Sequence, residues 1–174
     1  MRLLLDTQVM LWWLLDDPRL SAETRDLMAA SPCVVSVASI WEVAIKHRLG
    51  KLPVAPAAFR DQSLAAGALL LPVLDGHVIQ TAQLPLVHHD PFDRLLIAQA
   101  QVEGLMALSS DAHWPGYDVP LRRPRHSSTV LGTKLWAPAI AVSWISRTRS
   151  PQLSSSAVGL QRLSRRCSMD QSIC

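Results

Sequence analysis

The sequence predicts an α/β domain built on a parallel sheet. Over its first ~120 residues, short apolar runs alternate with longer stretches that have the spacing of helices. Of the 174 residues, 49% are hydrophobic and 18% are charged, which is enough apolar material for a sizeable core. This composition excludes a wholly disordered or fibrous chain. No apolar run approaches about 20 residues, so we expect no membrane-spanning helix.

Each expected strand is a short apolar run, and the expected helices lie between them. The strands are expected at Leu3–Leu5, Cys33–Ser36, Leu69–Leu71, Met106–Leu108 and Val119–Leu121. Helices are expected at Gln8–Leu15, Ser21–Ala30, Ala38–Leu49, Pro56–Ala66, Gly76–Ala82 and Pro91–Glu103. The last of these helices has the clearest signals: Asp90 as N-cap, Pro91 at the first helical position (N1) and Gly104 just beyond its end.

The two parts of the chain differ in composition. Residues 1–123 hold ten Lys or Arg and thirteen Asp or Glu, whereas residues 124–174 hold seven and one. The net charge of +3 therefore comes from the second part, and it does not indicate a basic nucleic-acid surface on the first. We expect residues 1–123 to form one folded domain. Residues 124–174, with eleven serines, are expected to be a basic tail that is disordered or not native; a tail that binds RNA is the alternative.

The cysteines and the N-terminus favour a cytoplasmic protein. Cys33, Cys167 and Cys174 are too few and too scattered for a disulfide framework or a zinc site. Asp6 interrupts the apolar N-terminal stretch, and no small-residue cleavage site follows it soon, so we expect no secretion. A reducing cytoplasm is the simplest setting.

Aspartates follow two of the expected strands. Asp6 comes directly after Leu3–Leu5, and Asp111 follows Met106–Leu108 after two serines. The carboxyl ends of parallel strands form the usual site of an open α/β sheet, so two carboxylates could meet there. Each aspartate could instead have a local role, since Asp6 could cap the next helix and Asp111 could begin a turn.

Two further acids lie on expected helices. Asp93 shares an apolar helical line with Leu96, Ile97 and Ala100, where an unpaired carboxylate would be costly and a metal ion would relieve the cost. The alternative is a first-turn acid that the helix dipole stabilises. Glu42 could join the same cluster, or it could simply pair with Lys46 one turn later.

Four carboxylates without His or Cys suit Mg²⁺ or Mn²⁺ better than zinc. Mg²⁺ held by carboxylates suits phosphodiester hydrolysis, because the metal activates water and neutralises charge on the phosphate. The sequence has no Gly-rich phosphate loop that could do this work instead. The spacing of the acids does not prove that they converge.

Four segments follow one another in the chain: LLLDTQVMLWWL, SVASIWEVAIKHRLGKLP, LPLVHHDPFDRLLIAQAQVEGL and LSSD. In this order they resemble the PIN-domain toxins of type II toxin–antitoxin systems, the VapC-like ribonucleases, over about residues 1–121. The resemblance implies a PIN-like three-layer α/β/α fold with a short parallel sheet. It also implies an endoribonuclease that uses Mg²⁺ or Mn²⁺, is inhibited by a cognate antitoxin and forms a homodimer.

The resemblance also assigns roles to residues. Asp6, Glu42, Asp93 and Asp111 match the catalytic, metal-binding acids. Thr7, Ser109 and Asp90 lie beside these acids, where they could orient ligands or water. Candidates for RNA-backbone contacts, which could equally be part of a solvated face, are Lys46, His47, Arg48 and Arg94.

Three functions compete at this point. The first is a metal-dependent endoribonuclease toxin, and the second is a catalytically inactive PIN-like module that binds RNA or an antitoxin. The third is a phosphotransfer domain, which would need an acidic cluster after the first strand and a Lys late in the fold. It is disfavoured because Thr7 and Gln8 follow Asp6, and Lys51 is the last Lys before the tail. His88 and His89 are interpreted as loop residues, since adjacent side chains rarely converge on one metal ion.

Overall fold

The computed structural model describes residues 1–124 and confirms the α/β fold class. All strand pairs are parallel, and the sheet order is β3-β2-β1-β4-β5. The strands are β1 (Leu3–Leu5), β2 (Cys33–Ser36), β3 (Leu69–Leu71), β4 (Met106–Leu108) and β5 (Leu121–Arg122). The first four lie where the sequence predicts them. The fifth begins later than expected, because pairing with β4 starts at the Pro120 carbonyl, which accepts from Ala107 N at 2.8 Å.

The six expected helices are all present, and their bounds agree within one residue. They are α1 (Thr7–Leu14), α2 (Ala22–Ala29), α3 (Val37–Arg48), α4 (Pro56–Ala65), α5 (Asp75–Thr81) and α6 (Pro91–Val102). The predicted caps are confirmed: Ser21 accepts from Thr24 N, and Asp90 accepts from Phe92 N. Gly104 has a φ of +59°, the left-handed conformation that ends a helix and favours glycine. A short 3₁₀ helix, Trp114–Gly116, follows β4.

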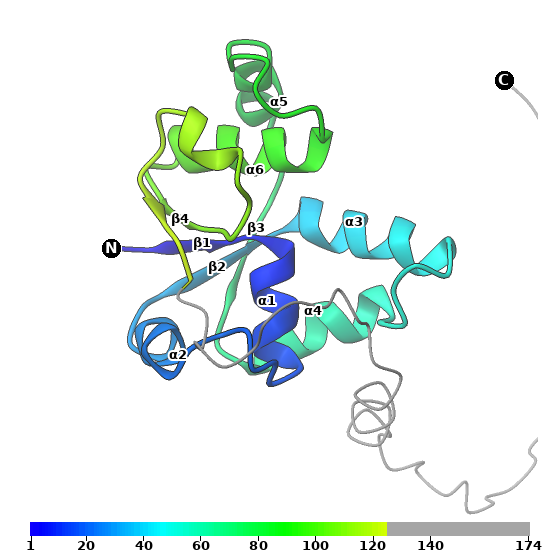
Figure 1. Cartoon of the computed structure of the whole chain (residues 1–174). Coiled ribbons are helices and arrows are strands. Elements are labelled where there is room, and N and C mark those ends of the chain that lie inside the picture. The colour runs from blue at the N-terminus through cyan, green and yellow to red at the C-terminus, as the bar shows by residue number, and fades with distance from the viewer. Residues whose placement is uncertain (125–174) are drawn as a thin grey trace, which may run out of the picture.

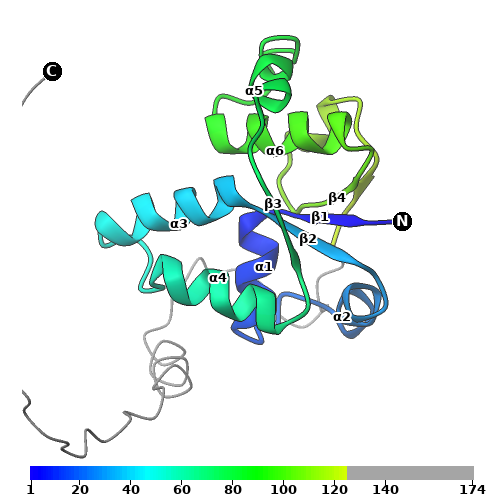
Figure 2. The same ribbon diagram turned by 180° about the vertical axis from the view of Figure 1, so that it is seen from behind.

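Two cores cover the two faces of the sheet, because successive side chains of a strand point to opposite faces. Leu3 and Leu5 belong to one core, which includes Phe59 of α4, and Leu4 belongs to the other, which includes Ile97 of α6. Figure 1 shows α5 and α6 on one side of the sheet and α1, α2 and α4 on the other. The edge strand β3 is nearest to the viewer in Figure 2.

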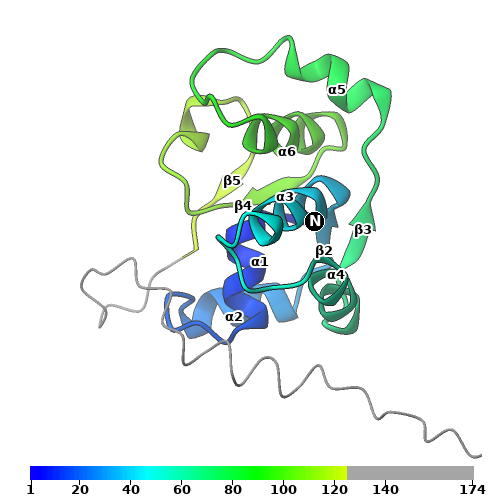
Figure 3. The ribbon, with the colours of Figure 1, turned by 90° about the vertical axis from the view of Figure 1, so that its right-hand side faces the viewer.

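Helix α3 lies between these two layers, as the view of Figure 3 shows, and it contacts both α4 and α6. Strands β1 and β4 are neighbours at the centre, and Leu5 pairs with Leu108. This register brings Asp6, just after β1, level with Ser109, just after β4. The carboxyl ends of the two strands therefore deliver their following residues to one place beside α3.

Among residues 1–124, no helix is long and apolar enough to cross a membrane. Cys33 is buried as a small apolar residue, as its place in a strand indicates. The predicted tail, residues 124–174, lies outside the described residues except for its first position. Its disorder or non-native origin stays a prediction.

Candidate active site

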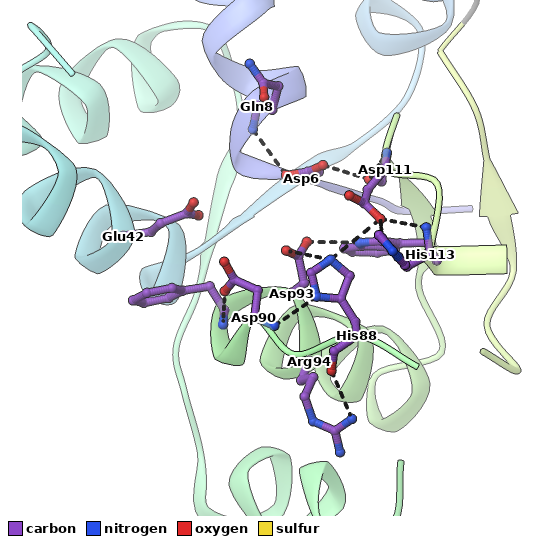
Figure 4. A network of polar contacts seen from close by, with 12 residues as sticks. Asp6, Gln8, Glu42, His88, Asp90, Asp93, Arg94, Asp111 and His113 are labelled. Atoms are coloured by element: carbon purple, nitrogen blue, oxygen red, sulfur yellow. Dashed lines mark hydrogen bonds and ion pairs between the residues drawn. The ribbon is translucent and has the colours of Figure 1, made fainter. Parts of the chain in front are cut away.

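Five carboxyl groups line one pocket of about 500 Å³ at the carboxyl end of β1. Asp6 follows β1, Glu42 comes from α3, Asp90 and Asp93 come from the start of α6, and Asp111 follows β4. Figure 4 shows these side chains facing the same space from four different elements. The four acids singled out in the sequence are therefore close in space, although the first and last are about a hundred residues apart.

Asp6 is the most buried of these acids. Ser109 Oγ donates to its Oδ2 at 2.7 Å, and Gln8 N donates to its Oδ1 at 3.1 Å. Burial raises the pKa of the Asp6 carboxyl to about 7; the Ser109 hydrogen bond opposes this shift, and the charges of Asp93 and Glu42 add to it. Asp6 thus caps α1, as the local alternative predicted, and also faces the pocket.

Two hydroxyl groups lie beside Asp6. Ser109 Oγ also accepts from Asp111 N at 3.1 Å, so this serine links the acids that follow β1 and β4. Thr7 lines the pocket, and its buried Oγ1 has no hydrogen-bond partner among the described residues. A buried hydroxyl without a partner is costly, so Thr7 fits a ligand or an ordered water in the pocket.

Asp93 accepts a hydrogen bond at one carboxylate oxygen and has a histidine ring near the other. Trp114 Nε1 donates to Oδ1 at 2.9 Å, and His88 Nε2 lies 3.4 Å from Oδ2. Burial raises the pKa of Asp93, against the effects of the Trp114 hydrogen bond and the His88 ring. Asp93 is also a first-turn acid of α6, as the local alternative predicted, and it lines the pocket.

Asp111 has the opposite electrostatic setting. Its Oδ1 accepts from His113 N at 2.7 Å and lies 3.0 Å from His113 Nδ1. Burial alone would raise the pKa of Asp111, but the hydrogen bonds from His113 and the nearby His88 and His113 rings outweigh it and lower that pKa. The predicted turn is present, and this carboxylate is ionised at neutral pH.

Glu42 forms the predicted ion pair with Lys46, one helical turn away. Burial would lower the pKa of Lys46, but its hydrogen bond and ion pair with Glu42 raise it instead. Both side chains line the pocket. The Glu42 carboxylate is thus part of the acid cluster, and Lys46 on the same helix neutralises part of its charge.

The donor set fits a divalent cation that prefers oxygen. Asp6, Glu42, Asp93 and Asp111 offer carboxylate oxygens, and their mutual repulsion adds to the raised pKa values of Asp6 and Asp93. A bound cation would relieve that repulsion, and Thr7 adds an unpaired hydroxyl. Oxygen donors of this kind suit Mg²⁺ or Mn²⁺.

Sequence reasoning missed His88, which it assigned to a loop. His88, Asp111 and His113 have ligand atoms within 4.8 Å of one another, a spacing that would allow a metal ion. However, His88 Nδ1 accepts a hydrogen bond from Asp90 N at 2.9 Å, so the ring proton is on Nε2. A protonated Nε2 is a donor and not a metal ligand. The neighbouring His89 is exposed, so the two histidines do not converge, as expected.

The basic candidates lie in different surroundings. Lys46 lines the pocket, Arg48 is exposed, and His47 Nδ1 lies 3.2 Å from the Leu52 carbonyl oxygen. Lys51, which sequence reasoning did not single out, also lines the pocket. Only its position just after the end of α3 could have suggested it.

Arg94 holds a loop instead of facing the pocket. Its guanidinium donates to the carbonyl oxygens of Thr81, Leu84, Pro85 and His88, at distances from 2.7 to 3.5 Å. Since these bonds occupy the guanidinium, they favour a structural role for Arg94 over the expected contact with RNA. They also fix the backbone that carries His88.

Replacing Arg94 with alanine should lower the free energy of unfolding by about 1–3 kcal/mol, because several hydrogen bonds from a charged group are lost. Urea denaturation of the Arg94→Ala variant measures this loss. Arg48→Ala, an exposed position on α3, is the control and should change stability little. Equal stability of the two variants would contradict the loop-holding role.

The fold and the site together define a class: a parallel α/β domain with a carboxylate cluster at the ends of its central strands. The family model described as "PIN domain" matches residues 3–119. The chain therefore belongs to the PIN domain family. PIN domains are generally nucleases.

Two solved structures share the fold. One, with a TM-score of 0.55 and 11% identity, is VapBC2 from Rickettsia felis bound to a DNA fragment from their promoter. The other, with a TM-score of 0.53 and 15% identity, is DNA-bound VapBC from Salmonella typhimurium. Each match covers 71% of this chain and 98% of the matched chain. No curated protein matches the chain significantly.

Proposed function

We propose that this protein is a metal-dependent endoribonuclease and the toxin of a VapC-like toxin–antitoxin pair. The observation that carries the proposal is the single pocket lined by Asp6, Glu42, Asp93 and Asp111. Membership of the PIN domain family supports nuclease activity, and the resemblance of the sequence motifs supports RNA as the substrate.

The four acids would hold Mg²⁺ or Mn²⁺, and each neighbouring group has a definable task. When bound, the ion supplies Lewis-acid stabilisation of phosphate charge and lowers the pKa of a water molecule. Ser109 fixes the orientation of Asp6, and Thr7 offers its free hydroxyl to water or ligand. Lys51, at the rim, supplies positive charge for the RNA backbone.

Two partners belong to the proposal. A cognate antitoxin is supported by the fold shared with the VapBC chains. A homodimer is supported by an apolar groove between α3 and the α5–α6 layer, lined among others by Val37, Trp41, Val78 and Leu95. Light scattering after gel filtration would show the dimer mass, and a monomer at all concentrations would contradict this part.

Cleavage of an RNA panel should require Mg²⁺ or Mn²⁺ and stop with EDTA. Asp6→Asn should lose at least about a hundredfold in rate, because several kcal/mol of charge stabilisation depends on the ion. Asp61→Asn, an exposed acid on α4 paired with Arg60, is the matched control and should cut normally. A wild-type protein that binds metal but cuts no RNA in a broad panel would favour the inactive binding module.

A further inference from the structure

We infer that Trp114 and His88 are positioning residues for the Asp93 carboxylate: the Trp114 indole donates a hydrogen bond to Oδ1, and the His88 ring lies beside Oδ2. This inference rests on the proposed function, because Asp93 is a metal ligand only if that proposal holds. It concerns two residues, Trp114 after β4 and His88 before α6, to which the sequence resemblance assigns no role in the site.

Trp114 is fixed by packing and has one polar task. Its side chain is fully buried in the core that includes Leu96 and Ile97. The indole N–H can only donate, and a buried indole needs an acceptor. That acceptor is Asp93 Oδ1 at 2.9 Å. A side chain that is fixed in the core therefore donates a hydrogen bond to one carboxylate oxygen of Asp93, the candidate metal ligand.

His88 approaches the other oxygen from the loop. Because its Nδ1 accepts from Asp90 N, its Nε2 carries the proton and lies 3.4 Å from Asp93 Oδ2 and 3.6 Å from Asp111 Oδ1. The backbone of His88 is held as well, since His88 N donates to Tyr117 Oη at 2.7 Å. Figure 4 shows the ring between Asp93 and Asp111.

This arrangement holds the Asp93 carboxylate in one orientation before a cation binds, and it leaves the carboxylate able to act as a ligand. Each carboxylate oxygen can accept two hydrogen bonds, so the bond from Trp114 leaves acceptor capacity on Oδ1, and Oδ2 accepts none from His88, whose ring lies 3.4 Å away. The two neighbours limit the rotation of the carboxylate, and partners of this kind tune the affinity of metal ligands. Removing either neighbour should weaken metal binding more than it weakens the fold.

The first test replaces Trp114 with phenylalanine, which keeps an aromatic ring and removes the N–H group. Calorimetric titration of the full chain with Mn²⁺ should show a Kd about tenfold weaker than that of the wild type. Trp13→Phe is the matched control, since Trp13 packs against the other core and does not line the pocket. A Trp114→Phe Kd within twofold of the wild type would overturn the inference.

A second measurement follows metal binding in the wild-type protein, so it does not depend on the folding of a variant. In the ¹⁵N–¹H spectrum of the wild type, the Trp114 indole signal should shift as Mg²⁺ saturates the protein, because its acceptor is a ligand. Comparison with the Trp114→Phe spectrum assigns that signal. A Trp114 signal that stays in place at saturation would overturn the inference.

His88 is tested by rescue. His88→Ala should weaken Mn²⁺ binding, and His88→Gln should recover part of the affinity, because the Gln amide restores an N–H donor. His89→Ala, at the exposed neighbour, is the control. An unchanged Kd in His88→Ala would remove His88 from the inference. If the wild type itself binds no Mn²⁺, the proposed function fails and the inference falls with it.

Discussion

Asp6→Asn should make the metal-free protein more stable than the wild type at pH 8. Burial raises the pKa of Asp6 to about 7 in the folded protein, against 3.8 for an unperturbed aspartate, as in the unfolded chain. As pH rises from about 4 to 7, the unfolded chain loses this proton while the folded protein keeps it. The Asp6 contribution to stability is therefore complete below pH 4 and is lost by the time the pH passes 7.

The shift sets an upper limit of about 4 kcal/mol on the cost of ionising Asp6, at 1.36 kcal/mol per pKa unit. Asparagine carries no charge but keeps an acceptor for Ser109 or Gln8 N, so the expected gain at pH 8 is about 1–3 kcal/mol. Urea unfolding in EDTA at pH 4 and pH 8 measures it. The gain should vanish at pH 4, and a variant less stable than the wild type at pH 8 would contradict the expectation.

Mg²⁺ or Mn²⁺ should raise the melting temperature of the wild-type protein at pH 8. At a hundredfold excess over Kd, binding to the folded state alone contributes about 2.7 kcal/mol, which corresponds to roughly 5–10 °C for a domain of this size. The rise should be smaller at pH 5.5, because Asp6 holds its proton below about pH 7 and must lose it to bind a cation.

Thermal scans with metal and with EDTA test this expectation. Asp93→Asn should lose most of the metal-induced rise, whereas Asp61→Asn, on α4 and not part of the pocket lining, should keep it. Equal rises in the two variants would show that the cation binds elsewhere. Reversal of the wild-type rise by EDTA excludes a non-specific effect of salt.

The elements and their ends could be predicted because their causes are local. Pro91 and Gly104 enclose α6, and the side chains of Ser21 and Asp90 cap their own helices. The apolar strands are recognisable because a parallel sheet covered on both faces needs continuous apolar runs. The late start of β5 was missed because it depends on which carbonyl meets β4, and β4 is distant in the sequence.

The candidate site could be predicted only as a set of residues. For each acid the sequence offered a local role and a shared one, and the structure shows both: Asp6 caps α1, Glu42 pairs with Lys46, Asp111 begins a turn, and all line one pocket. A local hydrogen bond uses only part of the acceptor capacity of a carboxylate. The local alternative therefore never excluded the shared role.

By itself, the sequence determined the order of helices and strands, their caps and the identity of the acids, since each depends on residues a few positions apart. The tertiary structure decided which groups hold those acids. Trp114 meets Asp93 across 21 residues, Ser109 meets Asp6 across 103, and Arg94 turns away from the pocket to hold the loop of His88. Such contacts depend on sheet register and side-chain packing. These bring together residues that are distant in the sequence, and no local sequence pattern indicates which of them will be in contact.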